Sequence, residues 1–310
     1  MPPPSSTTPD GSGASGDGAA GAVGPAVLDH VAVAVERWAD AWPRYAVELG
    51  GAWGSGGLNV GFGPAQLRFA NGARLEILQP WQVEANPFLR RFLDTNGPGP
   101  HHLTFKVADL TRALEVVTER GYAPVGVDLS DPMWKEAFLH PRQATGIVVQ
   151  LAEAAGDWTG PAPEGFPASR LEPPASLDHV THAVADLQDA LVLFGEVLGG
   201  AVRHEGGAGD VRWVDLVWSG PLTLRLLGPA SPGATPPVGA GGDVPLLDHL
   251  AGRPGRLHHL RFSLDDPPAV TGAASAQGAA AADTLGIDAA PAWVVPPVGN
   301  LGTRLVLVHP

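Results

Sequence analysis

Four segments of the chain open with the same short phrase, in which apolar and polar residues alternate. Alternation with a period of two is typical of a β-strand that has one buried face. The phrases fall into two pairs, so the chain is predicted to consist of two similar halves, each built from two copies of one unit. They read LDHVAVAV from Leu28, HHLTFKVADL from His101, LDHVTHAVADL from Leu177 and HHLRFSLDD from His258.

A helix is predicted after this strand in at least three copies. In the second copy, Leu110, Leu114 and Val117 share one helical face and Gly121 marks its end. Short β-branched runs separated by Gly or Pro follow, so the repeated unit is predicted to be βαβββ. The runs are GGLNVGFG, AQLRFA and ARLEILQP in the first copy, and EAFLHP and GIVVQLAE in the second.

The fourth copy departs from this pattern. Its segment DDPPAVTGAASAQGAAAADTLG has little amphipathic periodicity, and its proline pair fits only the start of a helix. We therefore expect a short or irregular helix in this copy.

Two stretches rich in Pro, Gly, Ser and Ala divide the chain. Residues 1–26 bury too little apolar surface to fold and are predicted to be a disordered tail. Residues 154–176 are predicted to be a linker between two α+β domains, residues 27–153 and 177–310, each with two βαβββ units.

Composition narrows the possible functions. The 310 residues carry 19 Lys and Arg against 32 Asp and Glu, a net charge of −13, which argues against a nucleic-acid-binding surface. With no cysteine present, thiolate nucleophiles and Cys-ligated zinc are excluded. No signal peptide or membrane-spanning stretch is evident, so we expect a cytoplasmic protein that acts on a small molecule, away from membranes.

Paired βαβββ units that open with an L-[DH]-H-[VL] strand resemble the vicinal oxygen chelate superfamily, which includes glyoxalase I, methylmalonyl-CoA epimerase, extradiol dioxygenases and bleomycin-binding proteins. The phrases FLRRFLDTNGPGPHHLTFKVADL and AFLHPRQATGIVVQL are most similar to methylmalonyl-CoA epimerases. The resemblance implies two open, cup-like barrels, with metal ligands on the first and last strand of each unit.

Carried onto this sequence, the resemblance implies a metal site of His30, Glu76, His102 and Gln150 in the first domain. Two imidazoles, a carboxylate and an amide oxygen would hold one divalent ion, which could be Zn²⁺, Ni²⁺, Co²⁺, Mn²⁺ or Fe²⁺, and would leave positions open for substrate oxygens.

The matching positions of the second domain are His179, Arg225, His259 and Val306. Arg repels a cation and Val cannot bind one, so this half is expected to be a metal-free copy that completes an internal pseudo-dimer. Arg225 could still hold an anion, or the half could serve as scaffold. The protein is then a monomer or a homodimer.

The resemblance implies an isomerase, epimerase or glyoxalase-type lyase that acts through a metal-stabilised enolate or enediolate. Because Gln150 cannot accept a proton at neutral pH, the candidate bases are Glu76, Glu136 and His140. His101 is expected to point away from the site. The alternatives are an Fe(II) extradiol-type dioxygenase, favoured by the two-His, one-carboxylate set, and a metal-free binding protein for a drug or metabolite.

Overall fold

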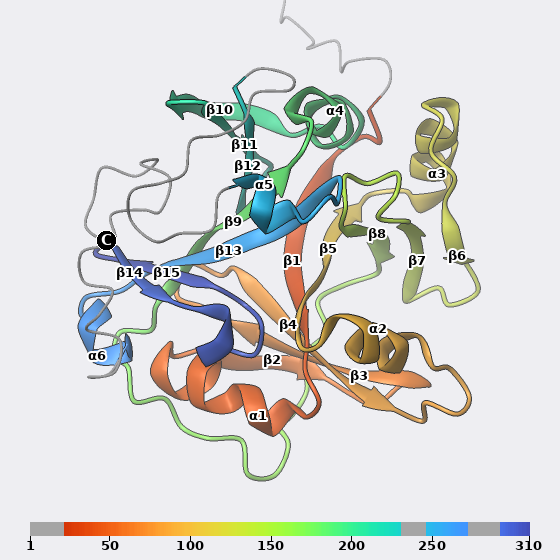
Figure 1. Ribbon diagram of the computed structural model, residues 1–310. Helices are drawn as coiled ribbons and strands as arrows, with labels where there is room; N and C mark the ends of the chain where they lie inside the picture. Colours follow the sequence, from red (N-terminus) through yellow and green to blue (C-terminus); the bar gives the residue numbers. More distant parts are fainter. Residues whose placement is uncertain (1–21, 231–245, 272–291) are drawn as a thin grey trace, which may run out of the picture.

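The computed structural model describes residues 22–230, 246–271 and 292–310 (Figure 1). The predicted tail lies outside these residues up to residue 21, as does most of the predicted helical stretch of the fourth copy. Val23 is buried, and its N–H donates to the carbonyl of Val197 at 2.9 Å. The chain is therefore packed against the second half before the predicted tail ends.

The first half forms one sheet of eight strands in the order β2-β3-β4-β1-β5-β8-β7-β6. β1 and β5, which carry the two repeated phrases, pair in antiparallel fashion at its centre. Each is flanked by the last strand of its own unit, so the sheet is two βαβββ units joined through their first strands. The strands are β1 (Ala26–Ala34), β2 (Ala52–Gly56), β3 (Gly61–Arg68), β4 (Arg74–Trp81), β5 (Gly99–Val107), β6 (Val125–Asp128), β7 (Trp134–Leu139) and β8 (Val148–Ala154).

The second half repeats this arrangement in a sheet of seven described strands, in the order β10-β11-β12-β9-β13-β15-β14. Its central antiparallel pair is β9 with β13. The repeat structure read from the sequence is therefore confirmed, with two of the three later strands of the fourth unit among the described residues. The strands are β9 (Ser176–Val184), β10 (Ala201–Ala208), β11 (Val211–Val217), β12 (Thr223–Pro229), β13 (Gly255–Ser263), β14 (Ala292–Val295) and β15 (Leu305–Val308).

A helix follows the first strand of every unit, as the pattern predicted. In the second unit the buried face includes Leu110 and Val117, and the Asp109 carboxylate caps the helix by accepting the N–H of Arg112 at 2.9 Å. The fourth helix is short and begins at the proline pair. These helices are α1 (Trp38–Trp42), continued by a π-helix (Pro43–Glu48), α3 (Leu110–Glu119), α4 (Leu187–Leu191), continued by a π-helix (Val192–Val197), and α6 (Pro267–Thr271).

Some elements differ from the prediction. The run GGLNVGFG is not a strand: residues 52–56 form β2 and the next strand begins only at Gly61. β6 and two further helices, α2 (Phe88–Asn96) and α5 (Leu246–Leu250), were not predicted. α2 and α5 each precede the first strand of the second unit in their half. None of the described helices is long and apolar enough to cross a bilayer.

The two halves share one hydrophobic core. Phe69 packs edge-to-face on Phe262 with ring centroids 5.0 Å apart, and Phe105 contacts Trp218 at 5.0 Å. The segment predicted to be a linker runs without helix or strand from residue 155 to 175, and Ala175 in it is fully buried. A continuous apolar core of this kind holds the halves in one fixed relation.

Glycines allow the halves to approach each other closely at two related places. A Cβ on Gly255 would lie 1.9 Å from the carbonyl oxygen of Thr145, and one on Gly302 would lie 1.8 Å from that of Pro98. The first contact joins the start of β13 to the turn before β8. The second joins the turn before β15 to the start of β5, so the two contacts are related by the repeat.

We predict that Gly255→Ala destabilises the protein by at least about 2 kcal/mol, because the new methyl group can be accommodated only if backbone moves. The free energy of unfolding in urea measures this effect. Gly57→Ala is the matched control, since a Cβ there meets nothing within 4 Å. Equal stability of the two variants would contradict the close packing of the halves.

His182 also joins the halves and should make stability depend on pH. Its Nε2 lies 2.8 Å from the Thr145 carbonyl, and burial lowers its pKa from 6.5 to about 4, with a smaller contribution from His249. Below pH 6.5 the unfolded chain binds a proton that the folded chain does not, so stability falls as pH drops toward 4. His182→Gln should remove up to about 3 kcal/mol of that fall. His140→Gln, in an exposed turn, is the control for replacing a histidine that does not join the halves.

Candidate metal centre

Strand register places the predicted ligands on one face of the first sheet. Ala32 on β1 lies opposite both Glu76 on β4 and His102 on β5. His30, two residues earlier on β1, lies opposite Thr104, which in turn lies opposite Gln150 on β8. Because side chains two apart along a strand share a face, the four side chains point to the same side from four adjacent strands.

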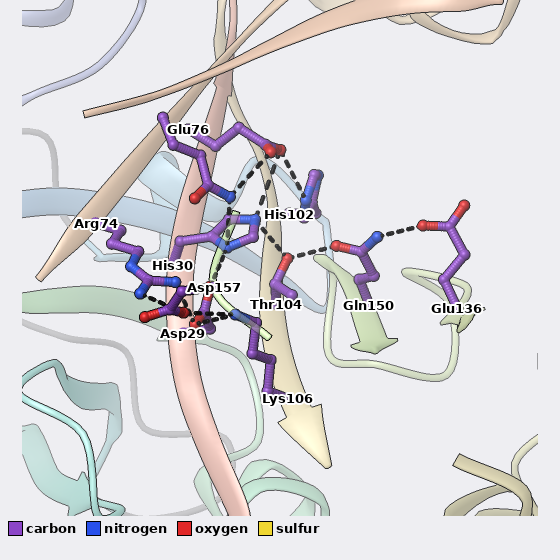
Figure 2. Close-up of polar contacts among 11 residues, drawn as sticks. Asp29, His30, Arg74, Glu76, His102, Thr104, Lys106, Glu136, Gln150 and Asp157 are labelled. Atoms are coloured by element: carbon purple, nitrogen blue, oxygen red, sulfur yellow. Dashed lines mark hydrogen bonds and ion pairs between the residues drawn. The ribbon is translucent and has the colours of Figure 1, made fainter. Parts of the chain in front are cut away.

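His30, Glu76 and His102 come together as a buried cluster (Figure 2). One ligand atom of each lies within 4.8 Å of the others. Glu76 Oε2 is 3.6 Å from His30 Nε2 and 3.6 Å from His102 Nε2. Ligand atoms bonded at about 2.1 Å to one ion lie roughly 3 to 3.4 Å apart, so only a small side-chain adjustment separates this cluster from a closed site.

Asp29 orients His30. Its Oδ2 accepts a hydrogen bond from His30 Nδ1 at 2.8 Å, which turns Nε2 toward Glu76. Arg74 and Lys106 bind the other Asp29 oxygen at 3.0 and 3.1 Å. Burial alone would raise the pKa of this carboxyl, but the hydrogen bond and charge of His30, followed by the charges of Lys106 and Arg74, hold the pKa well below its usual range. A carboxylate behind a histidine in this way fixes the ring and increases its basicity toward a metal ion.

His102 presents a nitrogen with no partner. Its Nδ1 lies 2.8 Å from Nδ1 of His101, whereas Nε2 is buried and has no hydrogen-bond partner. Burial, and then the neighbouring His101 and His30 rings, hold the pKa of His102 well below 6.5. The ring is therefore neutral at pH 7, the form that binds metal ions.

His30 is held differently. Burial alone would lower its pKa, but the charge of Glu76 and the hydrogen bond to Asp29 outweigh it and raise the pKa to about 9. The site therefore favours positive charge at His30 Nε2. A divalent cation placed among these atoms would satisfy the same carboxylates and displace that proton.

These observations fit a divalent ion. The donor set is two imidazoles and one carboxylate, a combination suited to zinc and to the first-row transition metals. A buried, unpartnered imidazole nitrogen beside a carboxylate costs free energy unless something binds it.

Gln150 and Glu136 continue the polar chain on β8 and β7 (Figure 2). Thr104 Oγ1 lies 2.9 Å from His30 Nε2 and donates to Gln150 Oε1 at 2.6 Å, while Gln150 Nε2 donates to Glu136 Oε2 at 2.7 Å. Trp134 Nε1 donates to the same Glu136 oxygen at 2.8 Å. Gln150 thus uses its carbonyl oxygen for Thr104, and its amide fixes the position of Glu136.

The structure changes the interpretation of two residues near the site and adds two that the sequence analysis did not identify. His140, a candidate base, is exposed and accepts the backbone N–H of Arg142 in its turn. His101 packs on Phe92 but also contacts a predicted ligand, so it is more than a residue of the far face. Asp29 and Thr104 were not singled out. The Asp-His pair in the first phrase was the available signal for Asp29.

The second half carries different chemistry at the same register. Arg225 stands where Glu76 stands in the first half and forms a buried, bidentate ion pair with Asp215 at 2.7 and 3.0 Å. Val306 stands in the position of Gln150. Burial and then Arg225 hold the pKa of His179 well below 6.5. Among the described residues, only the first half holds a cluster of three metal-ligating side chains.

Comparison with known proteins agrees with this architecture. Residues 29–138 match the family model described as the Glyoxalase/Bleomycin resistance protein/Dioxygenase superfamily. The uncharacterized protein YqjC of Bacillus subtilis (strain 168) is 29% identical over 143 residues, which are 42% of this chain and 94% of that protein.

Two solved structures extend the comparison. A mutant of 4-hydroxymandelate synthase from Streptomyces coelicolor is similar over 92% of this chain and 93% of its own, with a TM-score of 0.59 and 16% identity, so the whole four-unit fold is shared. Methylmalonyl-CoA epimerase from Mycobacterium tuberculosis covers 42% of this chain and 89% of its own, with a TM-score of 0.38 and 27% identity.

We predict that the protein purified without a His-tag contains about one divalent ion per chain and that His30→Ala combined with His102→Ala abolishes it, because two of three ligands are lost. Elemental analysis of anaerobically purified protein measures this. The matched control is His179→Ala with His259→Ala, the equivalent pair of the second half, which should retain the ion. A similar metal content in both double variants would contradict the assignment.

Proposed function

We propose that this protein, whose residues 29–138 form a domain of the Glyoxalase/Bleomycin resistance protein/Dioxygenase superfamily, is a metal-dependent isomerase or lyase acting on a small substrate with vicinal oxygens. The observation that carries the proposal is the buried cluster of His30, Glu76 and His102, with a nitrogen of His102 left unpartnered. A bound divalent ion would supply a Lewis acid that stabilises negative charge developing on substrate oxygens.

Glu136 is the best-placed proton acceptor among the side chains that would not bind the ion. Hydrogen bonds from Gln150 and Trp134 fix its Oε2, and the other oxygen remains available. Its strand position, two residues before Phe138, which pairs with Gln150, directs it to the face that carries the cluster. A positioned carboxylate of this kind can remove a proton next to a substrate carbonyl and return it.

Glu76 and Gln150 have supporting roles in this proposal. Glu76 would act chiefly as a ligand, because both histidine nitrogens approach its Oε2, and Gln66 Nε2 lies 3.4 Å from its Oε1. Gln150 would orient the base rather than exchange protons, since an amide has no basic site at neutral pH. If Thr104 turns away, the Gln150 oxygen is free to become a fourth ligand.

An iron-dependent ring-cleaving dioxygenase is the second candidate. The set of two histidines and one carboxylate matches the ligand triad of non-haem Fe(II) oxygenases. A third possibility is a protein that only binds its small molecule. The three hypotheses predict different behaviour of the metal-loaded protein: a dioxygenase consumes oxygen, an isomerase or lyase exchanges a substrate proton, and a binding protein does neither.

The test is solvent-proton exchange in ²H₂O with a panel of 2-hydroxy ketones and 2-hydroxy acids, followed by NMR. We expect exchange that requires the metal and that falls by about 10²-fold or more in Glu136→Gln, because the base is removed and the fold is kept. Glu153→Gln is the matched control: this carboxylate lies on the neighbouring strand and pairs with Lys135 at 2.6 Å.

Oxygen uptake with a panel of catechols is measured beside it. Uptake without proton exchange would replace the isomerase proposal by the dioxygenase. Binding without either reaction would leave a binding protein as the correct account.

A further inference from the structure

A cleft of about 610 Å³ lies between the two halves, and His101, which contacts the predicted ligand His102, is one of its lining residues. Its walls come from the C-terminal end of α2 and the start of β5 in the first half, and from α5 and the start of β13 in the second. The turns before β8 and β15 complete it. This volume is in the range of pockets that hold small molecules.

The cleft is strongly basic in a protein with a net charge of −13. Four of the 19 basic residues line it, namely Arg142, Arg253, Arg256 and Arg304, and none of the described lining residues is acidic. His101, His249 and His258 add three imidazole side chains. The lining of the cleft is therefore positively charged, although the chain as a whole is negatively charged.

Much of this charge is not compensated by the described residues. Neither Arg142 nor Arg256 forms an ion pair with any of them, and Arg253 reaches only the amide oxygen of Asn96, at 3.4 Å. Burial and then the charge of Arg253 lower the pKa of Arg256, as expected for cations crowded without a counter-charge. Nε2 of His249 is buried without a hydrogen-bond partner. Arg142, Arg253 and Arg256 are exposed, so their guanidinium groups are accessible to an anion that enters the cleft.

The repeat shows that three of these four arginines are an addition of the second half. Arg253, Arg256 and Arg304 occupy the positions that Asn96, Gly99 and Val148 occupy in the first half, counted from the paired strands. Basic residues here are therefore not required by the fold, which forms the same elements without them in the first half.

The walls are rigid. The cleft is bordered by the close backbone contacts of Gly146 with Gly255 and of Gly302 with Pro98, where a methyl group added to any of these glycines would lie about 2 Å from a backbone oxygen. The backbone that carries Arg256 and Arg304 is therefore fixed in position at the cleft.

We infer that this cleft binds a small oxyanion ligand that carries at least two negative charges, a phosphate ester or a dicarboxylate. Guanidinium groups match the planar geometry of both groups and bind them through paired N–H donors. The volume of about 610 Å³ favours a metabolite over a macromolecule. The site is independent of the proposed reaction and persists if that proposal is wrong.

The test is isothermal titration of the full chain with glucose 6-phosphate, with glutarate and with uncharged glucose. We expect one of the two anions to bind at the cleft, glucose not to bind, and affinity to fall with added salt. Arg142→Gln combined with Arg256→Gln should weaken binding by about tenfold or more. Arg91→Gln with Arg203→Gln, two exposed arginines outside the lining, should change it less than about twofold.

Two further measurements keep the outcome unambiguous. The single variant Arg256→Gln, checked for an unchanged melting temperature, replaces the double variant if the latter does not fold. Binding to the His30→Ala, His102→Ala variant should be retained. If the His30→Ala, His102→Ala variant loses binding while the arginine variant keeps it, the anion binds at the metal cluster and the inference is overturned. Absence of binding of either anion at about 10 mM would also overturn the inference.

Discussion

The antiparallel pairing of β1 with β5 is the constraint on which the candidate site depends. It brings two histidines from phrases more than seventy residues apart into one cluster, with ring centroids 5.8 Å apart. The last strand of each unit then pairs in parallel on the outer side of its own first strand, which delivers Glu76 and Gln150 to the same face. A slip of one residue in either pairing would turn these side chains to the opposite face.

Electrostatics follows from this geometry. The two histidines have opposite tendencies: Glu76 and Asp29 favour a positive charge at His30, whereas burial favours a neutral His102. Arg74 and Lys106 balance Asp29 from behind, so the negative charge left facing the cluster is that of Glu76. The arrangement is suited to a cation held in front of a ring of fixed, hydrogen-bonded groups.

The sequence allowed the repeat and the central strands to be predicted, because a histidine phrase repeated four times leaves few topologies open. It also identified His30, Glu76 and His102, which the structure brings into one cluster, as candidate ligands. The strand β2 could not be read, since AWGSG lacks alternation and is held mainly by backbone pairing with β3. α2 could have been found: Leu89 and Leu93, four apart, are its buried face. Asp29 and Thr104 act through contacts across strands, and these depend on exact register, which sequence spacing does not specify.

The comparison of the two halves shows how one frame can hold opposite charges. At a single register position Glu76 contributes to a cation-favouring cluster, and Arg225 contributes to an ion pair closed on Asp215. The paired histidines are kept in both, in similar T-shaped or tilted contact, so their packing alone does not decide function. What decides it is the residue on the neighbouring strand. Two cross-strand partners differ between the halves: Glu76 lies opposite Gln66, whereas Arg225 lies opposite Asp215. Because each strand contributes one side chain per rung to the shared face, these two positions together replace an open carboxylate by a closed ion pair without disturbing the sheet.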